Sequence, residues 1–276
     1  MAKKAPVKPR GKSVADLAGG GQSAPAGGGG WFQTGYDAVG EEVKRIDTMR
    51  EEWKNQIRRY WMPEKDDNGK TIVAVVVFID GIPFSYREHQ FYLNGNWRNW
   101  QTCLVGTGAK CPYCEAQNKN YFVGAYTVVD TREWKSKDNT VHKNEISFYP
   151  VKGDALKALR ILADARGGDL AGCAFRVSRS GDKSPNTGNV FDFIERLPTK
   201  KIRVKMTGIP EREITVLDTQ NAAVAKKFGF KQLVKPFDYP AVVKPKTRDE
   251  ALTWLGSQNI SAGSGEGNEG AAEVAY

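Results

Sequence analysis

The stretch TIVAVVVFID, residues 71–80, is a short apolar run dominated by β-branched side chains. It is too short and too branched for a helix, and such side chains pack well on a pleated strand. Gly81-Ile82-Pro83 then turns the chain, and residues 84–87 begin another strand. We therefore expect a β-hairpin here, with the rest of the fold built around it.

Strand-like segments continue on the C-terminal side of this hairpin. They occupy residues 121–130, 145–150, 173–178 and 190–196. Residues 154–165 predict a helix, because Leu156, Leu159 and Leu162 recur at helical spacing. Five or more short strands with one helix between them indicate a mainly β, α+β fold based on a small β-barrel.

Flanking helices are expected on both sides of this core. Residues 37–60 predict a helix that ends before Pro63. Its apolar residues recur at spacings of three and four: Val39, Val43, Ile46, Met49, Trp53 and Ile57. Beyond Leu197 the pattern weakens. It suggests strands at 202–206 and 213–217, helices at 221–228 and 248–255, and an extended segment at 236–245.

The two ends differ in composition from the rest of the chain. Residues 1–30 are rich in Ala, Gly and Pro and carry five basic residues against one Asp, so we expect a flexible basic arm. Residues 257–276 carry three Glu and no Lys or Arg, which predicts a weakly acidic disordered tail. Between them we expect a core at 31–197, with an insert at about 88–120, and an extension of the core at 198–256.

Charge and cysteine content narrow the environment and partners. The 276-residue chain has a net charge of +9 and a pI of about 9.3, which favours polyanionic partners. No apolar stretch approaches the roughly 18 residues of a membrane span. No apolar run follows the basic start, so we expect no signal peptide. The chain is therefore expected in the cytoplasm, where clustered cysteines more often bind metal than form disulfides.

One histidine and three cysteines have the types and spacing of a metal site. His89, Cys103, Cys111 and Cys114 read H-x13-C-x7-C-x2-C, and the C-x2-C pair lets one tight turn direct both sulfurs at one ion. Zinc takes four such ligands, so we predict one structural zinc ion. Cys173 lies in a strand pattern and is expected to be a buried core thiol.

Two alternatives to a structural zinc stay open. The four residues could be unrelated, with a core thiol, surface thiols and a solvated histidine. A catalytic zinc would need a vacant position and an acidic base, for which Glu88 and Glu115 are adjacent to ligands. Four protein ligands leave no vacancy, and neither a phosphate-binding loop nor a nucleophile–histidine set is present in the sequence. We therefore expect a protein that is not an enzyme.

Basic and aromatic residues alternate in several clusters, as in proteins that hold single-stranded nucleic acid. In such proteins the cations neutralise phosphates and the rings stack on bases. Aromatic residues are more often part of a core, and each ring taken singly is open to that interpretation. The candidate contact residues are Arg58, Arg59, Tyr60, Trp61, Trp97, Arg98, Trp100, Tyr126, Arg132, Trp134, Lys135, Lys137, Phe148, Arg176, Arg179 and Lys183.

With this ligand pattern, the basic start and the acidic end, the chain resembles the single-stranded DNA-binding (helix-destabilising) proteins of T-even bacteriophages. The resemblance implies an OB-fold core with an inserted zinc subdomain ligated by His89, Cys103, Cys111 and Cys114. It implies a protein that coats single-stranded DNA without sequence preference during phage replication, recombination and repair. It also implies self-association along the strand, replication and recombination partners at the C-terminal tail, and the cytoplasm of an infected bacterial host.

Three other functions are compatible with the same residues. A zinc-containing RNA-binding or transcription-related phage protein would bind single-stranded RNA equally well. A zinc-dependent nuclease or deaminase would consume its substrate. A structural interaction protein would bind no oligonucleotide, and its positive charge would be incidental.

Overall fold

The computed structural model describes residues 39–41, 43–44, 57–66, 68–93, 95–135, 139–181, 184–258 and 260. For Asn96 and Arg98 it describes the backbone alone. The chain divides into two units, residues 1–56 and 57–276. In the first unit, residues 39–41 and 43–44 are helical, as the sequence predicts. The basic arm and the tail beyond residue 260 lie outside the described residues.

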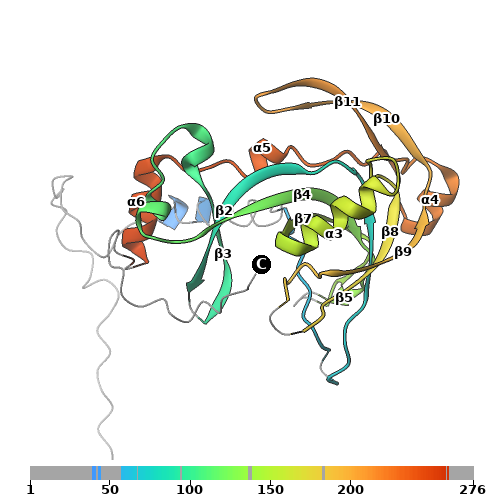
Figure 1. Ribbon diagram of the computed structural model, residues 1–276, viewed down its shortest axis with the longest axis horizontal. Coiled ribbons are helices and arrows are strands. Elements are labelled where there is room, and N and C mark those ends of the chain that lie inside the picture. The colour runs from blue at the N-terminus through green and yellow to red at the C-terminus, as the bar shows by residue number, and fades with distance from the viewer. Residues whose placement is uncertain are drawn as a thin grey trace, which may run out of the picture. The chain divides into compact units, whose positions relative to one another are not determined.

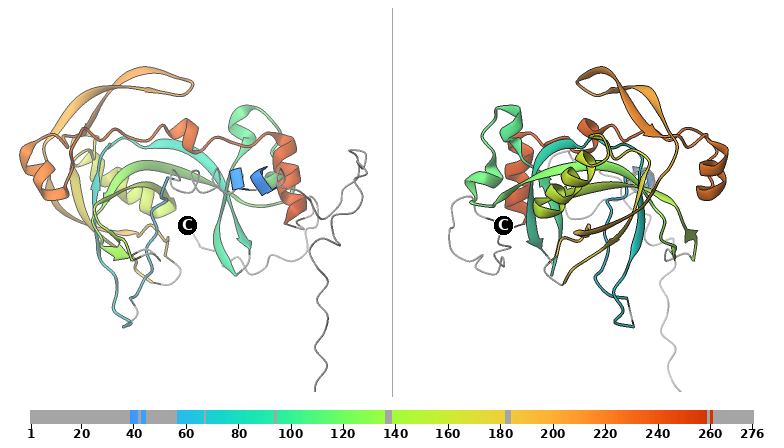
Figure 2. Two further views of the ribbon diagram at one scale, coloured as in Figure 1. Left: turned by 180° about the vertical axis from the view of Figure 1, so that it is seen from behind. Right: turned by 45° about the vertical axis from the view of Figure 1, so that its right-hand side comes forward.

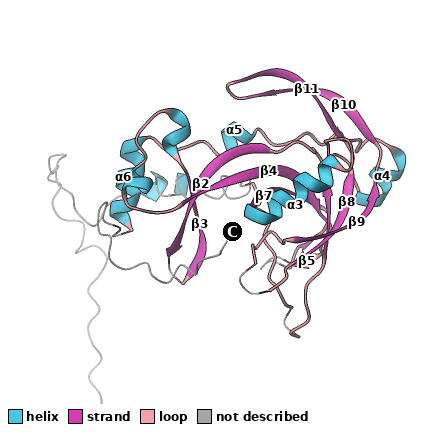
Figure 3. Ribbon diagram, viewed as in Figure 1, coloured by secondary structure: helices cyan, strands magenta, loops and turns pink. Residues whose placement is uncertain are grey.

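The second unit is built on a seven-stranded antiparallel sheet (Figure 1). Its strand order is β3-β2-β4-β1-β8-β9, and β7 pairs with the opposite edge of β4. The strands are β1 (Ala74–Phe78), β2 (Phe84–Leu93), β3 (Asn96–Thr102), β4 (Asn120–Asp130), β7 (Glu145–Lys152), β8 (Cys173–Ser178) and β9 (Val190–Arg196). The predicted mainly β class is confirmed, since strands form the centre and helices lie around it (Figure 3).

The hairpin predicted at residues 71–87 is wrong. Strands β1 and β2 both run antiparallel to β4 along the same edge, with Val77 opposite Val129 and Ser85 opposite Gly124. They therefore follow one another in the same direction, and the residues between them form a kink instead of a reversal. Gly81 serves close packing here: a Cβ at this position would lie 2.1 Å from the backbone nitrogen of Ala171.

A segment before the sheet covers the outer edge of β7. The Tyr60 N–H donates to the Phe148 carbonyl, and the Phe148 N–H donates to the Arg58 carbonyl, both at 2.8 Å. The Met62 N–H donates to the Asn186 carbonyl at 2.8 Å. Residues 57–62 are thus extended, and the predicted helix does not reach residue 60. In the described part of the chain, no pairing of β7 with β9 closes the sheet into a barrel.

The main core lies on the inner face of this sheet. Helix α3 (Gly153–Asp164), expected from the leucine spacing, buries Ala155 and Leu159 against it. Tyr60 and Met62 enter the same core from the segment beside β7. The other members come from β1, β4, β7, β8 and their flanks: Ala74, Val76, Phe78, Tyr126, Val128, Tyr149, Val151, Leu170, Cys173, Phe175 and Val177. Cys173 is fully buried, as predicted.

Residues 198–256 cover the outer face of the sheet. They form a β10–β11 hairpin and three helices, whose bounds are β10 (Thr199–Met206), β11 (Ile209–Leu217), α4 (Ala222–Phe228), α5 (Tyr239–Val242) and α6 (Arg248–Ser257). Leu217 and Val224 pack against β1, while Tyr239 and Met206 pack against Ala125 and Phe148. Short helix α5 interrupts the segment that was predicted to be extended. No helix in the described residues has the length and apolar character needed to cross a membrane.

Candidate metal centre and nucleic-acid interface

Four side chains predicted as metal ligands converge at one point. The ligand atoms of His89, Cys103, Cys111 and Cys114 all lie within 4.8 Å of one another. The Cys103 and Cys114 sulfurs are 3.7 Å apart, and His89 Nε2 is 3.5 Å from Cys111 Sγ and 3.6 Å from Cys114 Sγ. The sulfurs are too far apart for a disulfide, which requires about 2.05 Å.

These distances fit a tetrahedral metal. Zinc–sulfur bonds of about 2.3 Å and zinc–nitrogen bonds of about 2.0 Å place neighbouring sulfurs about 3.8 Å apart and nitrogen about 3.6 Å from sulfur. His89, Cys103 and Cys111 are buried, and Cys114 is half-buried. A buried group of three thiols and one imidazole could hold a metal ion such as zinc.

Three short elements position the four ligands. His89 lies near the end of β2, and β3 returns the chain to Cys103, whose N–H donates to the Arg87 carbonyl at 2.9 Å. Cys103 precedes the 3-10 helix η2 (Leu104–Thr107), and Cys111 precedes helix α2 (Pro112–Glu115), which carries Cys114. Gly108 has φ of 79° and reverses the chain between the two helices. The predicted insert is therefore a hairpin followed by two single turns of helix.

The histidine is oriented by a contact on its far side. Its Nδ1 lies 3.0 Å from the backbone carbonyl of Asn118 and 3.2 Å from the side-chain oxygen of that residue. These oxygens accept hydrogen bonds from the Nδ1–H group, so Nε2 keeps its lone pair for the position between the sulfurs. Burial lowers the pKa of His89, which also favours the neutral, metal-binding form. Burial, together with the neighbouring thiols of Cys111 and Cys114, raises the pKa of the Cys103 thiol to about 12, and a bound cation would reverse that effect.

Helix α6, from the C-terminal part of the chain, packs on the group formed by His89, Cys103, Cys111 and Cys114 (Figure 2). This group of candidate metal ligands is called the metal cluster. Its Trp254 ring contacts the rings of Phe91 and Tyr113 at centroid distances of 4.9 and 5.8 Å. Arg248, at the start of α6, pairs with Glu115 at 2.8 Å and donates to the Lys110 carbonyl at 2.9 Å. The sequence pattern predicted the helix, but nothing in it linked the helix to the metal cluster.

Both carboxylates considered as catalytic bases are engaged away from the cluster. Glu88 lies on the opposite face of β2 from His89, because neighbouring residues of a strand alternate. It pairs with Arg59 and Lys152 at 2.7 Å each. Burial opposes its ionisation, but these two cations outweigh burial and lower the pKa of Glu88 to about 2. Glu115 is exposed and paired with Arg248.

Three of the aromatic residues assigned to nucleic-acid contact lie in the core. Tyr60 and Tyr126 are 2% exposed and Phe148 is 3% exposed. Tyr60 packs edge-on against Tyr149 at 4.8 Å, and Tyr126 packs against Phe78 at 5.0 Å. Strand alternation and the segment beside β7 turn these rings inward. They are not accessible to a base, and we leave them out of the interface.

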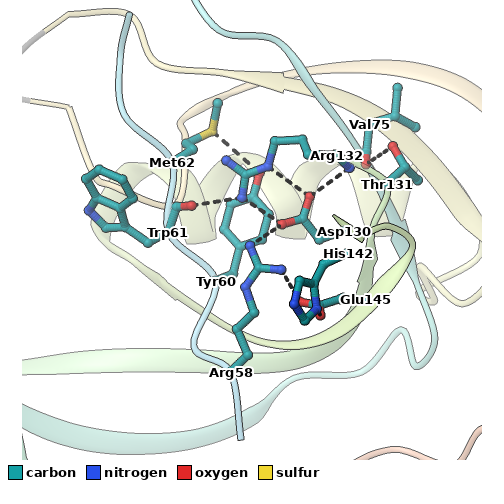
Figure 4. Close-up of polar contacts among 10 residues, drawn as sticks. All are labelled: Arg58, Tyr60, Trp61, Met62, Val75, Asp130, Thr131, Arg132, His142 and Glu145. Carbon is teal, nitrogen blue, oxygen red and sulfur yellow. Dashed lines mark hydrogen bonds and ion pairs between the residues drawn. The ribbon is translucent and has the colours of Figure 1, made fainter. Parts of the chain in front are cut away.

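Arg58 and Arg132, which lie near Tyr60, form an ion-paired cluster with two carboxylates (Figure 4). Arg132 makes two bonds to the buried carboxylate of Asp130, at 2.9 and 2.7 Å, and donates to the Trp61 carbonyl at 2.8 Å. Arg58 donates to Asp130 at 3.2 Å and also pairs with Glu145. Two guanidinium groups and two carboxylates balance one another. Trp61 directs its indole away from this cluster (Figure 4).

A small hairpin lies beside this cluster. Strands β5 (Trp134–Lys135) and β6 (Val141–His142) pair, and the Trp134 ring stacks on His142 at a centroid distance of 4.0 Å. Arg58 lies over the same indole at 4.8 Å. His142 also contacts Glu145 through Nδ1 at 2.5 Å. Lys135 is exposed.

The β2–β3 hairpin presents the most accessible aromatic pair of the interface. Tyr92 is 52% exposed and Trp97 is 37% exposed, and their rings contact at a centroid distance of 5.1 Å. Trp100, on β3, lies beneath the Arg59 guanidinium at 4.1 Å. Tyr92 was not predicted, and its position at the tip of a hairpin becomes visible only in the structure. Arg98 lies on β3, but its side chain is outside the description.

The remaining predicted contacts lie elsewhere or are not described. Arg176 on β8 is exposed and paired with Asp192 at 3.3 Å. Arg179 donates to the Ser184 carbonyl at 2.8 Å, within the loop between β8 and β9. Lys137 and Lys183 lie outside the described residues. The predicted contacts are therefore dispersed along the described part of the sheet, and the β2–β3 hairpin carries the most exposed aromatic ring among those of them that are described, that of Trp97.

Comparison of the chain with protein-family models, with curated proteins and with solved structures gave no match.

Proposed function

We propose that this protein is a sequence-nonspecific single-stranded DNA-binding protein that uses one structural zinc ion and catalyses no reaction. The observation that carries the proposal is the location of the metal cluster. His89 lies on β2 and Cys103 directly follows β3, and these two strands form a hairpin whose tip exposes Tyr92 and Trp97. Exposed rings beside cations are what base stacking on a single strand requires.

Zinc would be held by His89, Cys103, Cys111 and Cys114. Thiolate and imidazole ligands suit zinc, and four protein ligands make a closed, structural site. Such an ion adds its binding free energy to the folding of the residues around it. Here it would fix the hairpin and the packing of α6, without contacting DNA.

The strand pairings support an OB-fold, a five-stranded and partly open Greek-key barrel that binds oligonucleotides. Kinked β1 and β2 would together form the first strand, followed by β4, β7, β8 and β9. The first strand pairs with both β4 and β8, and helix α3 connects β7 to β8. Residues 57–62 occupy the outer edge of β7, where barrel closure would require β9.

This assignment agrees with the resemblance to the helix-destabilising proteins of T-even phages. Within it, the protein coats single-stranded DNA during phage replication, recombination and repair in the cytoplasm of an infected bacterium. The basic arm would contribute to self-association along the strand. The acidic tail would contact replication and recombination proteins.

Intrinsic tryptophan fluorescence tests the proposal directly. The full chain is titrated with single-stranded DNA, duplex DNA and single-stranded RNA at two salt concentrations, and its zinc content is measured after purification. We expect quenching by single-stranded DNA, weaker binding to duplex, strong salt dependence and about one zinc per chain. A duplex preference, or affinity that salt does not change, would contradict the proposal. Equal affinity for RNA would favour an RNA-binding protein, and loss of substrate would favour an enzyme.

A further inference from the structure

A buried carboxylate with two cationic partners lies on β2, on the opposite face of the strand from His89. Glu88 is 1% exposed. It accepts hydrogen bonds from Arg59 Nη2 at 2.7 Å and from the Tyr86 hydroxyl at 2.6 Å, and it pairs with Lys152 Nζ at 2.7 Å. Lys152 also donates to Gln90 at 3.2 Å. One buried anion therefore fixes two long cationic side chains that originate far apart in the chain.

The charges of this group do not cancel. Arg59 and Lys152 bring two positive charges to the single negative charge of Glu88, whereas Arg58 and Arg132 meet two carboxylates in the neighbouring cluster. The Arg59 and Lys152 side chains remain 20% and 21% exposed. A surplus positive charge is thus held in place at the protein surface.

Two aromatic rings lie beside these cations. Arg59 is 4.1 Å from the centre of the Trp100 ring, and Lys152 is 4.8 Å from that of Tyr121. Sheet register explains the arrangement: Tyr121 lies directly opposite Glu88, and Trp100 lies directly opposite Gln90. Both rings therefore project from the same face of the sheet as Glu88, and both are half-buried.

We infer that Arg59, Lys152, Trp100 and Tyr121 form a subsite for one nucleotide of a single strand. The two cations bind the phosphate, and the rings offer stacking surfaces to the base. Glu88 is the positioning residue: its Oε1 holds both cations at 2.7 Å and so reduces the ordering that binding would otherwise require. This inference rests on the proposed function and adds Glu88, Lys152 and Tyr121 to the residues found from the sequence.

Glu88→Gln gives the sharpest test, because two explanations predict opposite results. The substitution raises the net charge by one, so unspecific electrostatics predicts tighter binding of DNA. If Glu88 positions Arg59 and Lys152, binding to an oligothymidylate weakens about fivefold despite the added charge. Affinity is measured by fluorescence anisotropy over a range of salt concentrations. Metal content and thermal unfolding of each variant establish that it is folded.

Lys152→Gln is the second variant, and Lys157→Gln is its matched control. Lys157 lies on α3, is 67% exposed and pairs with Asp154, so the control removes the same charge elsewhere. We expect Lys152→Gln to weaken binding about tenfold and to reduce the slope of log affinity against log salt by about 0.7. Trp100→Leu, which keeps a large apolar side chain, weakens binding about tenfold by loss of stacking while the salt slope stays unchanged.

The outcomes separate this subsite from the proposed function. The subsite is overturned, and the proposed function stays in place, if three results are found together. The parent protein binds single-stranded DNA with strong salt dependence, Glu88→Gln binds it more tightly, and the two lysine variants bind it equally well. A parent protein that does not bind single-stranded DNA overturns both. If Glu88→Gln does not fold, Lys152→Gln and Trp100→Leu decide the matter by the same criteria.

Discussion

Two regions of this protein combine arginine with aromatic side chains, and the fold uses them in opposite ways. Around residues 57–62, Arg58 and Arg132 are neutralised by Asp130 and Glu145, and Tyr60 lies in the core. At the β2–β3 hairpin, Tyr92 and Trp97 face solvent, and Arg59 and Lys152 bring two positive charges to the single carboxylate of Glu88 on β2. The two regions differ in the number of carboxylates that the fold brings to their cations. The alternation of basic and aromatic residues in the sequence does not predict that number.

The largest expected effect concerns the zinc ion proposed for His89, Cys103, Cys111 and Cys114. Cys111→Ser should abolish stoichiometric zinc, lower the stability of the chain by on the order of 5 kcal/mol and remove binding to single-stranded DNA. Zinc content, thermal unfolding and DNA titration are measured together. Cys173→Ala, in the core away from the cluster, is the control and should keep its zinc. A stable, DNA-binding Cys111→Ser protein would show that the hairpin does not need the metal.

A second prediction uses a buried carboxylate that has hydroxyl and amide partners. Asp80 accepts from the Tyr239 hydroxyl at 2.6 Å and from the Thr127 N–H at 2.8 Å, and burial raises its pKa to about 7. Between about pH 4 and 7 the folded chain then holds a proton that the unfolded chain has lost. The contribution of Asp80 to stability therefore falls as pH rises through that window, by up to about 4 kcal/mol in total.

Asp80→Asn should remove this pH dependence, because it replaces the carboxyl group by a carboxamide of nearly the same shape that does not titrate. Free energies of unfolding by denaturant, measured at half-unit pH intervals, give the difference between parent and variant. We expect that difference to change steadily from pH 4 to 7 and to stay constant above about pH 8. A difference that is constant over the whole range would show that Asp80 has an ordinary pKa in the folded protein.

A substitution of Asp130 tests the ion-paired cluster that contains Arg58 and Arg132, two residues predicted from the sequence to contact DNA. Its side chain is fully buried, so Asp130→Asn leaves two guanidinium groups without their shared anion and should destabilise the chain by about 3 kcal/mol. The affinity of the folded protein for single-stranded DNA should change by less than a factor of two. Glu133→Gln, on an exposed carboxylate, is the matched control. A large loss of DNA affinity without loss of stability would place this cluster in the interface.

The smallest expected effect on stability comes from the exposed hairpin tip. Trp97→Ala should lower the free energy of unfolding by less than about 1 kcal/mol, because the residue is 37% exposed and its ring contacts the exposed ring of Tyr92. It should weaken DNA binding by about 1 kcal/mol through lost stacking. Ile161→Ala, at a 68% exposed apolar residue of α3, serves as the control for removal of a surface apolar group. Equal DNA affinity in the two variants would remove Trp97 from the interface.

The amino-acid sequence was sufficient for the metal cluster and for most secondary structure. Strands β8 and β9 coincide with the alternating segments 173–178 and 190–196, and α3 follows from three leucines at helical spacing. The four candidate ligands were predicted because a C-x2-C pair with a further cysteine and a histidine offers the four donors that zinc takes, and the structure brings their ligand atoms together. Both kinds of feature depend on residues that lie close to one another along the chain, so a single sequence is enough to predict them.

Only the tertiary structure decided how these elements pair and which rings are accessible. The apolar run of residues 71–80 was identified as a strand, but its continuation into β2 along one edge of β4 depends on the approach of Ala171 to Gly81. Likewise, Tyr60 is buried because its segment lies against β7, and Arg58 is neutralised because Asp130 and Glu145 meet it there. These contacts join residues more than sixty positions apart, and no periodicity in the sequence encodes them.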